Sequence, residues 1–123
     1  SGGGLHSLGI QADSSMWAFG RNLYAQLGNG STSSRSFPVQ IGSPNKWSKV
    51  DAGYEHSTAL HSDSTLWTWG RNGHGELANS LSFGYKAFVP TQVSNEKWIE
   101  EIFFIINQSL FRVFTNYFSS SLL

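Results

Sequence analysis

The sequence has no cysteine and little charge. Without cysteine the chain has no disulfide, no thiolate metal site and no thiol nucleophile. Charged residues make up only 13% of the chain, and eight basic residues balance eight acidic ones. A neutral balance creates no long-range field that would attract nucleic acid or an anionic membrane surface. Nucleic acid is therefore not an expected partner.

The first ten residues lack the basic segment and the long apolar core of a signal peptide. The sequence does not fix a compartment, and the cytoplasm is the expected one. What the chain has in abundance is glycine, at 13 residues, and aromatic side chains, at 15% of the total. Many aromatics, many glycines and few charges favour tightly turned β structure in a single domain of 123 residues.

An internal repeat is the strongest signal in the sequence. Residues 3–29 and 53–79 align at an offset of 50, since Gly3 matches Gly53. The identical pairs are Gly3/Gly53, His6/His56, Ser7/Ser57, Asp13/Asp63, Ser14/Ser64, Trp17/Trp67, Gly20/Gly70, Arg21/Arg71, Asn22/Asn72, Leu27/Leu77 and Asn29/Asn79. Phe19 recurs as Trp69, and further on Pro38 recurs as Pro90 and Trp47 as Trp98. A fixed period of this length is typical of repeat architectures.

Each copy predicts four short strands. Two of them alternate around an Asp-Ser turn, at 6–10 and 16–20 and again at 56–60 and 66–70, and so predict hairpins. Gly20 and Gly70 end the second strand, where the backbone is expected to need the freedom of glycine.

A third strand starts at a proline, at 37–41 and 89–93, and a fourth is led by tryptophan, at 46–53 and 97–104. Four strands in about 50 residues is the pattern of a propeller blade.

These residues resemble the repeat of the regulator of chromosome condensation family. The second copy carries the resemblance through residues 53–60, 66–72 and 75–77, and the first through their equivalents. The residues that match the repeat are Gly3, His6, Ser7, Asp13, Trp17, Gly20, Asn22, Leu27, Pro38, Trp47, Gly53, His56, Ser57, Asp63, Trp67, Trp69, Gly70, Asn72, Leu77, Pro90 and Trp98. The resemblance implies a seven-bladed β-propeller of four-stranded blades.

Two repeats are too few to close such a ring, because propellers need about 4–8 blades. We therefore expect an all-β fold, a partial β-propeller of two four-stranded blades with a degenerate C-terminal segment. The first repeat is assigned to 1–52, the second to 53–101, and a degenerate third start or hydrophobic tail to 102–123.

The tail has apolar residues at helical spacing. It is interpreted as a degenerate blade strand with a frayed end, and an oligomer-forming or membrane-surface helix remains the alternative. Polar residues such as Asn107 and Arg112 argue against a membrane span.

Several of these residues could also carry chemistry. His56, Ser57 and Asp63 are the residue types of a hydrolase triad, but a triad must converge on one reaction centre. Because the same set recurs in the first copy, a structural role is the favoured interpretation. The histidines are not expected to converge on a metal. Arg21 and Arg71 could each bind a phosphate, but each stands alone in the sequence, which favours a solvated arginine at a strand end. No catalytic, cofactor or metal residue is assigned.

The favoured function is a non-catalytic protein-protein interaction scaffold. The resemblance implies protein partners, among them a small GTPase, and an alternative role as a guanine-nucleotide exchange factor or GTPase regulator within a complete propeller. A hydrolase is the least favoured alternative. Uncovered blade edges and an aromatic face also predict self-association.

Overall fold

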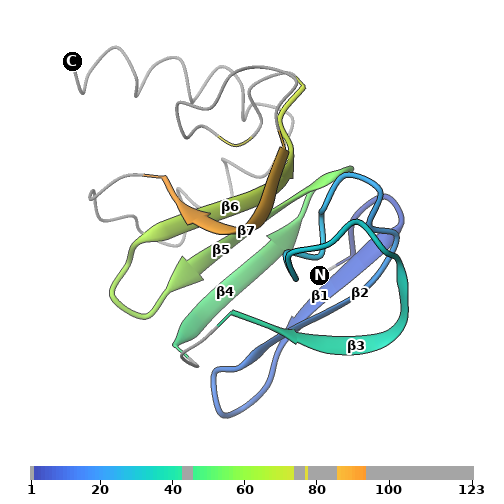
Figure 1. Ribbon diagram of the computed structural model, residues 1–123. Coiled ribbons are helices and arrows are strands. Elements are labelled where there is room, and N and C mark those ends of the chain that lie inside the picture. The colour runs from blue at the N-terminus through green and yellow to red at the C-terminus, as the bar shows by residue number, and fades with distance from the viewer. Residues whose placement is uncertain (1, 43–45, 74–76, 78–85, 94–123) are drawn as a thin grey trace, which may run out of the picture.

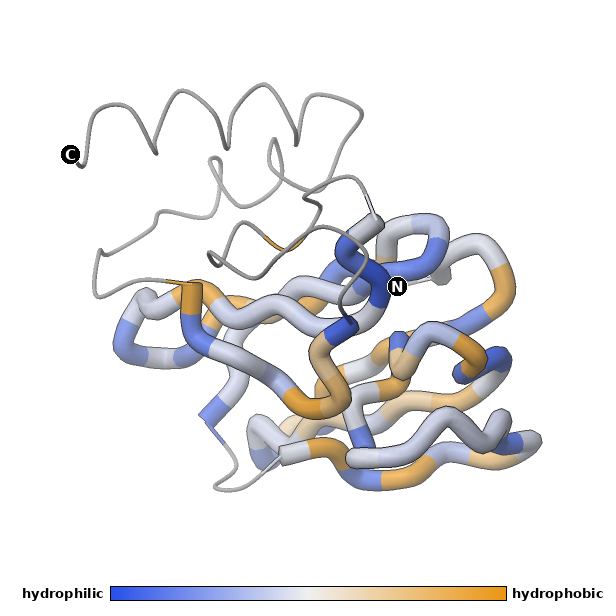
Figure 2. The backbone as a smooth tube through the Cα atoms, turned by 45° about the horizontal axis from the view of Figure 1, so that its top comes forward, coloured by the Kyte–Doolittle hydropathy of each residue, from blue (hydrophilic) through white to orange (hydrophobic). Residues whose placement is uncertain are grey.

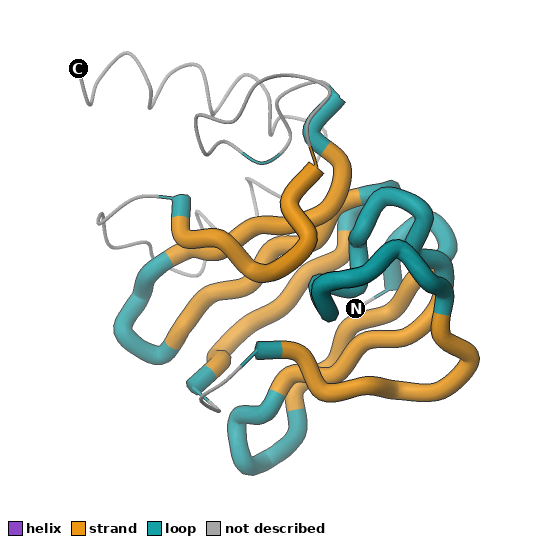
Figure 3. Tube along the Cα trace, in the orientation of Figure 1, coloured by secondary structure: helices purple, strands orange, loops and turns teal. Residues whose placement is uncertain are grey.

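The computed structural model describes residues 2–42, 46–73, 77 and 86–93, which form two antiparallel sheets (Figures 1 and 3). These residues contain strands and no helix. The strands are β1 (His6–Ile10), β2 (Met16–Gly20), β3 (Arg35–Ile41), β4 (Trp47–Ala52), β5 (His56–His61), β6 (Leu66–Arg71) and β7 (Lys86–Gln92). The all-β, partial-propeller prediction is confirmed. The segment around Trp98 and the tail at 102–123 lie outside the described residues.

The two predicted hairpins are confirmed, and they share one register. Ile10 lies opposite Met16 in β1–β2, and Leu60 lies opposite Leu66 in β5–β6. Both turns contain a serine in the left-handed region, Ser14 with φ 66° and the equivalent residue of the second copy with φ 70°. The second copy thus repeats the first at the level of individual backbone angles.

Glycine is required where the second strand of each hairpin ends. Gly20 has φ 115° and Gly70 has φ 103°, values that L side chains rarely adopt. A Cβ at Gly20 would lie 2.6 Å from the Leu5 main-chain oxygen, and one at Gly70 would lie 2.9 Å from that of Glu55. The loop that leads into the first strand therefore crosses closely over the end of the second.

One sequence prediction is corrected by the sheet topology. We expected the strand led by Trp47 to close the first blade, but β4 pairs with β5 and belongs to the second sheet. The described strand orders are β1-β2-β3 and β4-β5-β6-β7. Sequence repeat and sheet are therefore out of phase by one strand. The physical reason is that only three residues, 53–55, join β4 to β5 as neighbours in one antiparallel ladder, whereas β3 and β4 belong to different sheets.

The core lies between the two sheets, which pack face to face (Figure 1). In the first sheet, the buried Leu8, Met16 and Ala18 lie on the same side as His6, because side chains alternate along a strand. In the second sheet, Trp69 is completely buried and belongs to the same core cluster. Figure 2 shows hydrophobic and hydrophilic residues interspersed along the described chain. None of the described residues forms a helix long and apolar enough to cross a membrane.

Candidate functional site

His6 of the first His-Ser dipeptide meets Ser57 of the second between the sheets. His6 Nε2 lies 2.9 Å from Ser57 Oγ, and the Ser57 hydroxyl donates to the Gln26 main-chain oxygen at 2.6 Å. Because the serine proton is used on that carbonyl, the serine oxygen accepts the Nε2–H of a neutral imidazole. This buried chain of hydrogen bonds joins β1, the loop after β2 and β5.

Burial determines the charge state of His6. Only 3% of this residue is exposed. Loss of solvation, followed by the nearby His56, lowers the pKa of His6 from 6.5 to about 4. The imidazole is therefore neutral at physiological pH, and its Nε2–H tautomer makes the hydrogen bond to Ser57. A charged His6 would be unfavourable in this interface.

Trp69 completes the contact between the sheets. Its indole Nε1 donates to the same Gln26 oxygen at 2.9 Å. Gly28 makes room for the indole, since a Cβ there would lie 2.6 Å from Trp69 Nε1. Gly28 also has φ 80°, so this position requires glycine for both its conformation and its contact. One carbonyl of the first copy thus receives two hydrogen bonds from the second.

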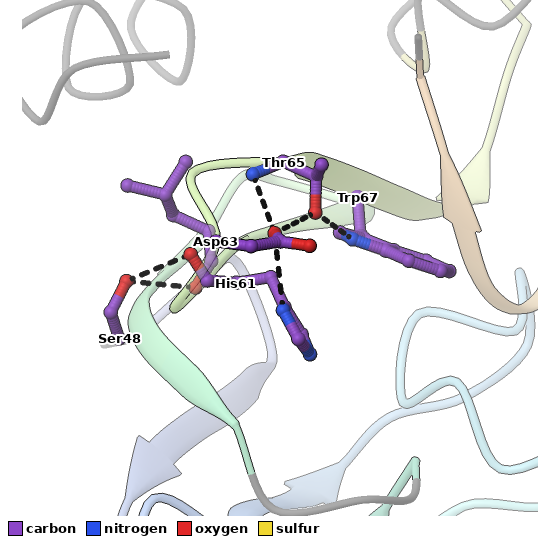
Figure 4. Close-up of polar contacts among 6 residues, drawn as sticks. Ser48, His61, Asp63, Thr65 and Trp67 are labelled. Atoms are coloured by element: carbon purple, nitrogen blue, oxygen red, sulfur yellow. Dashed lines mark hydrogen bonds and ion pairs between the residues drawn. The ribbon is translucent and has the colours of Figure 1, made fainter. Parts of the chain in front are cut away.

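Asp63 does not approach the His56-Ser57 pair. It lies in the turn after β5, at the far end of the hairpin from His56, which is opposite Gly70. The Asp63 carboxylate instead accepts from the Thr65 amide at 3.0 Å and from the Thr65 hydroxyl at 2.5 Å (Figure 4). The residues of the suspected triad are therefore separated by the length of a hairpin.

Thr65 in turn orients Trp67, and Ser15 orients Trp17 in the first copy. Thr65 Oγ1 accepts from Trp67 Nε1 at 2.9 Å, while Ser15 Oγ accepts from Trp17 Nε1 at 2.8 Å. The Ser15 hydroxyl donates to Asp13 at 2.6 Å. Sequence comparison missed these hydroxyl residues because serine and threonine are not identical. The signal was present as a hydroxyl two residues after the aspartate in both copies.

Each of the repeated asparagines Asn22 and Asn72 stabilises the loop that follows it. Asn22 Oδ1 accepts from the Leu27 amide at 2.9 Å, and Asn72 Oδ1 accepts from the Leu77 amide at 3.2 Å. Both leucines are completely buried. Each asparagine thus closes a loop of the same length and places a leucine in the core.

The remaining repeat positions are two glycines, two prolines and two tryptophans. Gly3 and Gly53 lie against the imidazole of their own copy, where a Cβ would come within 2.6 Å and 2.2 Å of it. Trp47 is buried and packs edge-to-face on Trp67, with ring centroids 5.9 Å apart. Pro38 is exposed on β3 and Pro90 is half-buried on β7. Trp98 lies outside the described residues. Among the described residues, no group of histidines and carboxylates could hold a metal ion.

The first sheet has a second, open face. Ser7 and Phe19 are paired there, in the register that pairs Ser57 with Trp69 in the second sheet. Phe19 is 41% exposed, whereas Trp69 is 0% exposed. Trp17, Phe19 and Pro38 line a shallow cavity of about 350 Å³ on this face. The same repeat position is thus covered in one copy and open in the other.

Arg21 and Arg71 are brought together, although they are far apart in the sequence. Glu55 forms an ion pair with Arg71 and lies 4.0 Å from Arg21. The expectation that each arginine stands alone is therefore wrong. Packing of the two copies side by side places their equivalent arginines at one rim of the sheets, which the repeat offset by itself does not reveal.

Solved structures with the same fold cover most of the chain. Prp20p from Saccharomyces cerevisiae, described with its binding properties to Gsp1p and histones, matches 77% of this chain at 21% identity and a TM-score of 0.67. Human WBSCR16 matches 76% at 23% identity and a TM-score of 0.68. Yeast RCC1 (Prp20) bound to Kap60 matches 77% at 21% identity and a TM-score of 0.65. The chain spans about a quarter of these proteins, namely 26%, 24% and 25%.

Family models match the sequence directly. Two models of the regulator of chromosome condensation (RCC1) repeat match residues 13–60 and 47–76, and together they extend from Asp13 to Glu76. No curated protein sequence matches the chain. The matched residues run from the first Asp-Ser turn through β2, β3 and β4 to the complete second hairpin. They include Gln26, Ser57 and Trp69 of the contact between the sheets. The chain belongs to the regulator of chromosome condensation (RCC1) repeat family.

Proposed function

We propose that the chain is a non-catalytic propeller module that acts as a protein-protein interaction scaffold. The observation that carries the proposal is the use of the repeated polar side chains within the fold. Ser57 is held between His6 and a main-chain oxygen, and Asp63 is held by Thr65. These residues position the sheets, which leaves the loops and open faces for partners.

The hydrolase alternative makes an opposite prediction for Ser57. If the serine is structural, Ser57→Ala lowers the free energy of unfolding by about 1–3 kcal/mol, because the Gln26 oxygen and His6 lose a partner. Urea unfolding followed by tryptophan fluorescence measures this loss. A variant that keeps its stability and loses an esterase activity of the wild-type chain would contradict the proposal.

Protein partners are supported by the relatives and by exposed apolar groups. Prp20p is described with Gsp1p and histones, and Kap60 is bound to Prp20 in another structure. We propose a small GTPase as one partner of a complete propeller that contains these repeats. A nucleotide-release assay on small GTPases separates binding from exchange. The scaffold proposal expects binding without accelerated release from this chain.

The open face of the first sheet also supports self-association of the chain. Trp69 is covered by Gln26 and Gly28 of the preceding copy, so the face that bears Trp17 and Phe19 is expected to accept a similar surface. A second copy of this chain can supply one. We therefore propose that the isolated chain self-associates through the face around Phe19.

Sedimentation of the full chain tests this arrangement with a matched control. Phe19 is 41% exposed on the open face, and Phe88 is 40% exposed on β7. Phe19→Glu should convert the chain to a monomer because a buried charge is costly, whereas Phe88→Glu should leave the association unchanged. A monomeric wild-type chain, or equal effects of the two variants, would overturn the proposal.

A further inference from the structure

The rim where the two copies meet carries a cluster of cations around one aromatic ring. The guanidinium carbon of Arg71 lies 4.9 Å from the centre of the Tyr24 ring, and that of Arg21 lies 5.9 Å from it. Lys86 Nζ lies 5.9 Å from the same ring. These separations are those of cation-π contacts, which hold cations over an aromatic face. Tyr24 thus gathers charges from both sheets at one place.

The cations outnumber the carboxylate that contacts them. Glu55 pairs with Arg71 and lies 4.0 Å from Arg21. The side chain of Glu55 is 12% exposed, whereas those of Arg21 and Arg71 are 33% and 39% exposed. The acid is therefore the buried member and the guanidinium groups face outward. The rim presents positive charge, although the chain as a whole is neutral.

Large apolar side chains flank this cluster. Leu5, Leu23 and Tyr54 are 61%, 54% and 72% exposed. They belong to the same rim, since the Leu5 oxygen accepts from the Arg21 amide at 2.8 Å and the Leu23 oxygen accepts from Lys86 Nζ at 3.5 Å. The Tyr54 ring lies against Gly4, next to Leu5. Exposed tyrosine and arginine side chains with apolar neighbours are typical of the centres of protein interfaces.

We propose that this rim, made of Leu5, Arg21, Leu23, Tyr24, Tyr54, Glu55, Arg71 and Lys86, binds an acidic segment of a partner protein. Guanidinium groups bind carboxylates in a bidentate geometry, and the leucines and tyrosines accept apolar side chains between the acids. A nucleic acid fits less well, because the exposed Leu5 and Leu23 can contact apolar side chains of a peptide but have no apolar partner along a phosphate backbone. The inference rests on the proposed scaffold function and specifies a partner for one of its surfaces.

A direct binding experiment on the full chain tests the proposal. The probe is a fluorescein-labelled peptide of about ten residues in which glutamate alternates with leucine, followed by fluorescence polarisation at low and physiological salt. We expect binding that weakens with salt. Arg21→Gln combined with Lys86→Gln should weaken it by about tenfold, since both lost charges face the peptide. Replacement of the same two residues by glutamate should weaken it further.

The matched control is Lys46→Gln. Lys46 is exposed at the opposite end of the second sheet, next to Trp47 and the turn after β5. This variant should bind the peptide like the wild type, and circular dichroism should show all variants folded. No binding by the wild type, or the same loss in the control, would overturn the inference. Tighter binding of a single-stranded oligonucleotide of similar charge would overturn it as well.

The outcome of the peptide-binding experiment is independent of the sedimentation test at Phe19. Phe19 lies on the open face of the first sheet, so association through that face reports on the scaffold function without the rim. If the peptide fails to bind while self-association through Phe19 persists, the rim inference alone fails. If the chain neither binds the peptide nor self-associates, the scaffold function fails with it.

Discussion

Phe19 and Trp69 occupy the same position of the repeat and have opposite surroundings. Each lies on the second strand of a hairpin opposite a serine, yet Trp69 is 0% exposed and Phe19 is 41% exposed. The difference comes from what lies in front of the strand. Trp69 faces Gly28 and the Gln26 oxygen of the preceding copy, whereas the face of Phe19 opens onto a cavity of about 350 Å³. The two copies thus share one internal fold, but only the second has another sheet packed against this face.

The largest expected effect is the loss of the covered tryptophan. Trp69→Ala removes a buried indole and its hydrogen bond to Gln26, and should lower the free energy of unfolding by about 3–5 kcal/mol. Phe19→Ala should cost only about 1 kcal/mol, because much of this ring is already in water. Urea unfolding of both variants measures the difference. Equal costs would show that the two faces are equally covered in solution.

The covered interface should also be sensitive to acid. The pKa of His6 is 6.5 when exposed and about 4 when folded, so between these values the unfolded chain binds a proton that the folded chain does not. The contribution of His6 to the free energy of unfolding is therefore fully present above pH 6.5. It is lost as the pH falls towards 4, which lowers the free energy of unfolding by up to about 3 kcal/mol. Urea midpoints at several pH values measure it. His6→Gln should flatten the profile in this window, and an unchanged slope would contradict the assignment.

Substitution of Gly20 and Gly70, which end the second strand of each hairpin, should destabilise the two copies to a similar extent. Gly70→Ala and Gly20→Ala each place a Cβ within 2.9 Å of the main chain at a positive φ, and should cost about 2 kcal/mol. Gly9 is the control, because a Cβ there meets no atom within 4 Å. Gly9→Ala should be neutral or slightly stabilising. Thermal unfolding of the three variants compares them, and a cost confined to Gly70 would show that the copies are not equivalent at this crossing.

The smallest expected effect concerns the hydroxyls that orient the turn tryptophans. Thr65→Val and Ser15→Ala each remove the bridge between an aspartate and an indole, and should cost about 1 kcal/mol. Because the bridge is internal to each hairpin, the two costs should be similar. Chemical unfolding is the measurement. A much larger cost for Thr65 would mean that the turn depends on the neighbouring sheet.

Local structure could be predicted from the sequence because it depends on neighbouring residues. Alternation with Trp17 and Trp67 predicted both hairpins, and glycine at the strand ends predicted the positive φ values of Gly20 and Gly70. The membership of β4 could not be predicted in this way. A strand led by Trp47 has the same local pattern whether it closes one sheet or opens the next.

The candidate sites show the same division. Asp63 and Ser57 have the residue types of a triad, and only the hairpin geometry separates them. Arg21 and Arg71 have no common feature in the sequence beyond the repeat, and only the packing of the copies brings them to one carboxylate. Residue type therefore indicated candidate chemistry, while proximity across sheets determined which candidates could act together.

The sequence by itself determined the repeat, its family and the hairpin of each copy, because these follow from periodicity, turn chemistry and glycine conformations. The tertiary structure decided which strand joins which sheet, that His6 of one copy is bonded to Ser57 of the other, and that Trp69 is covered while Phe19 is open. The physical reason is that burial and hydrogen bonding between sheets depend on atoms distant in the chain. A repeated local pattern does not specify which residues pack against it.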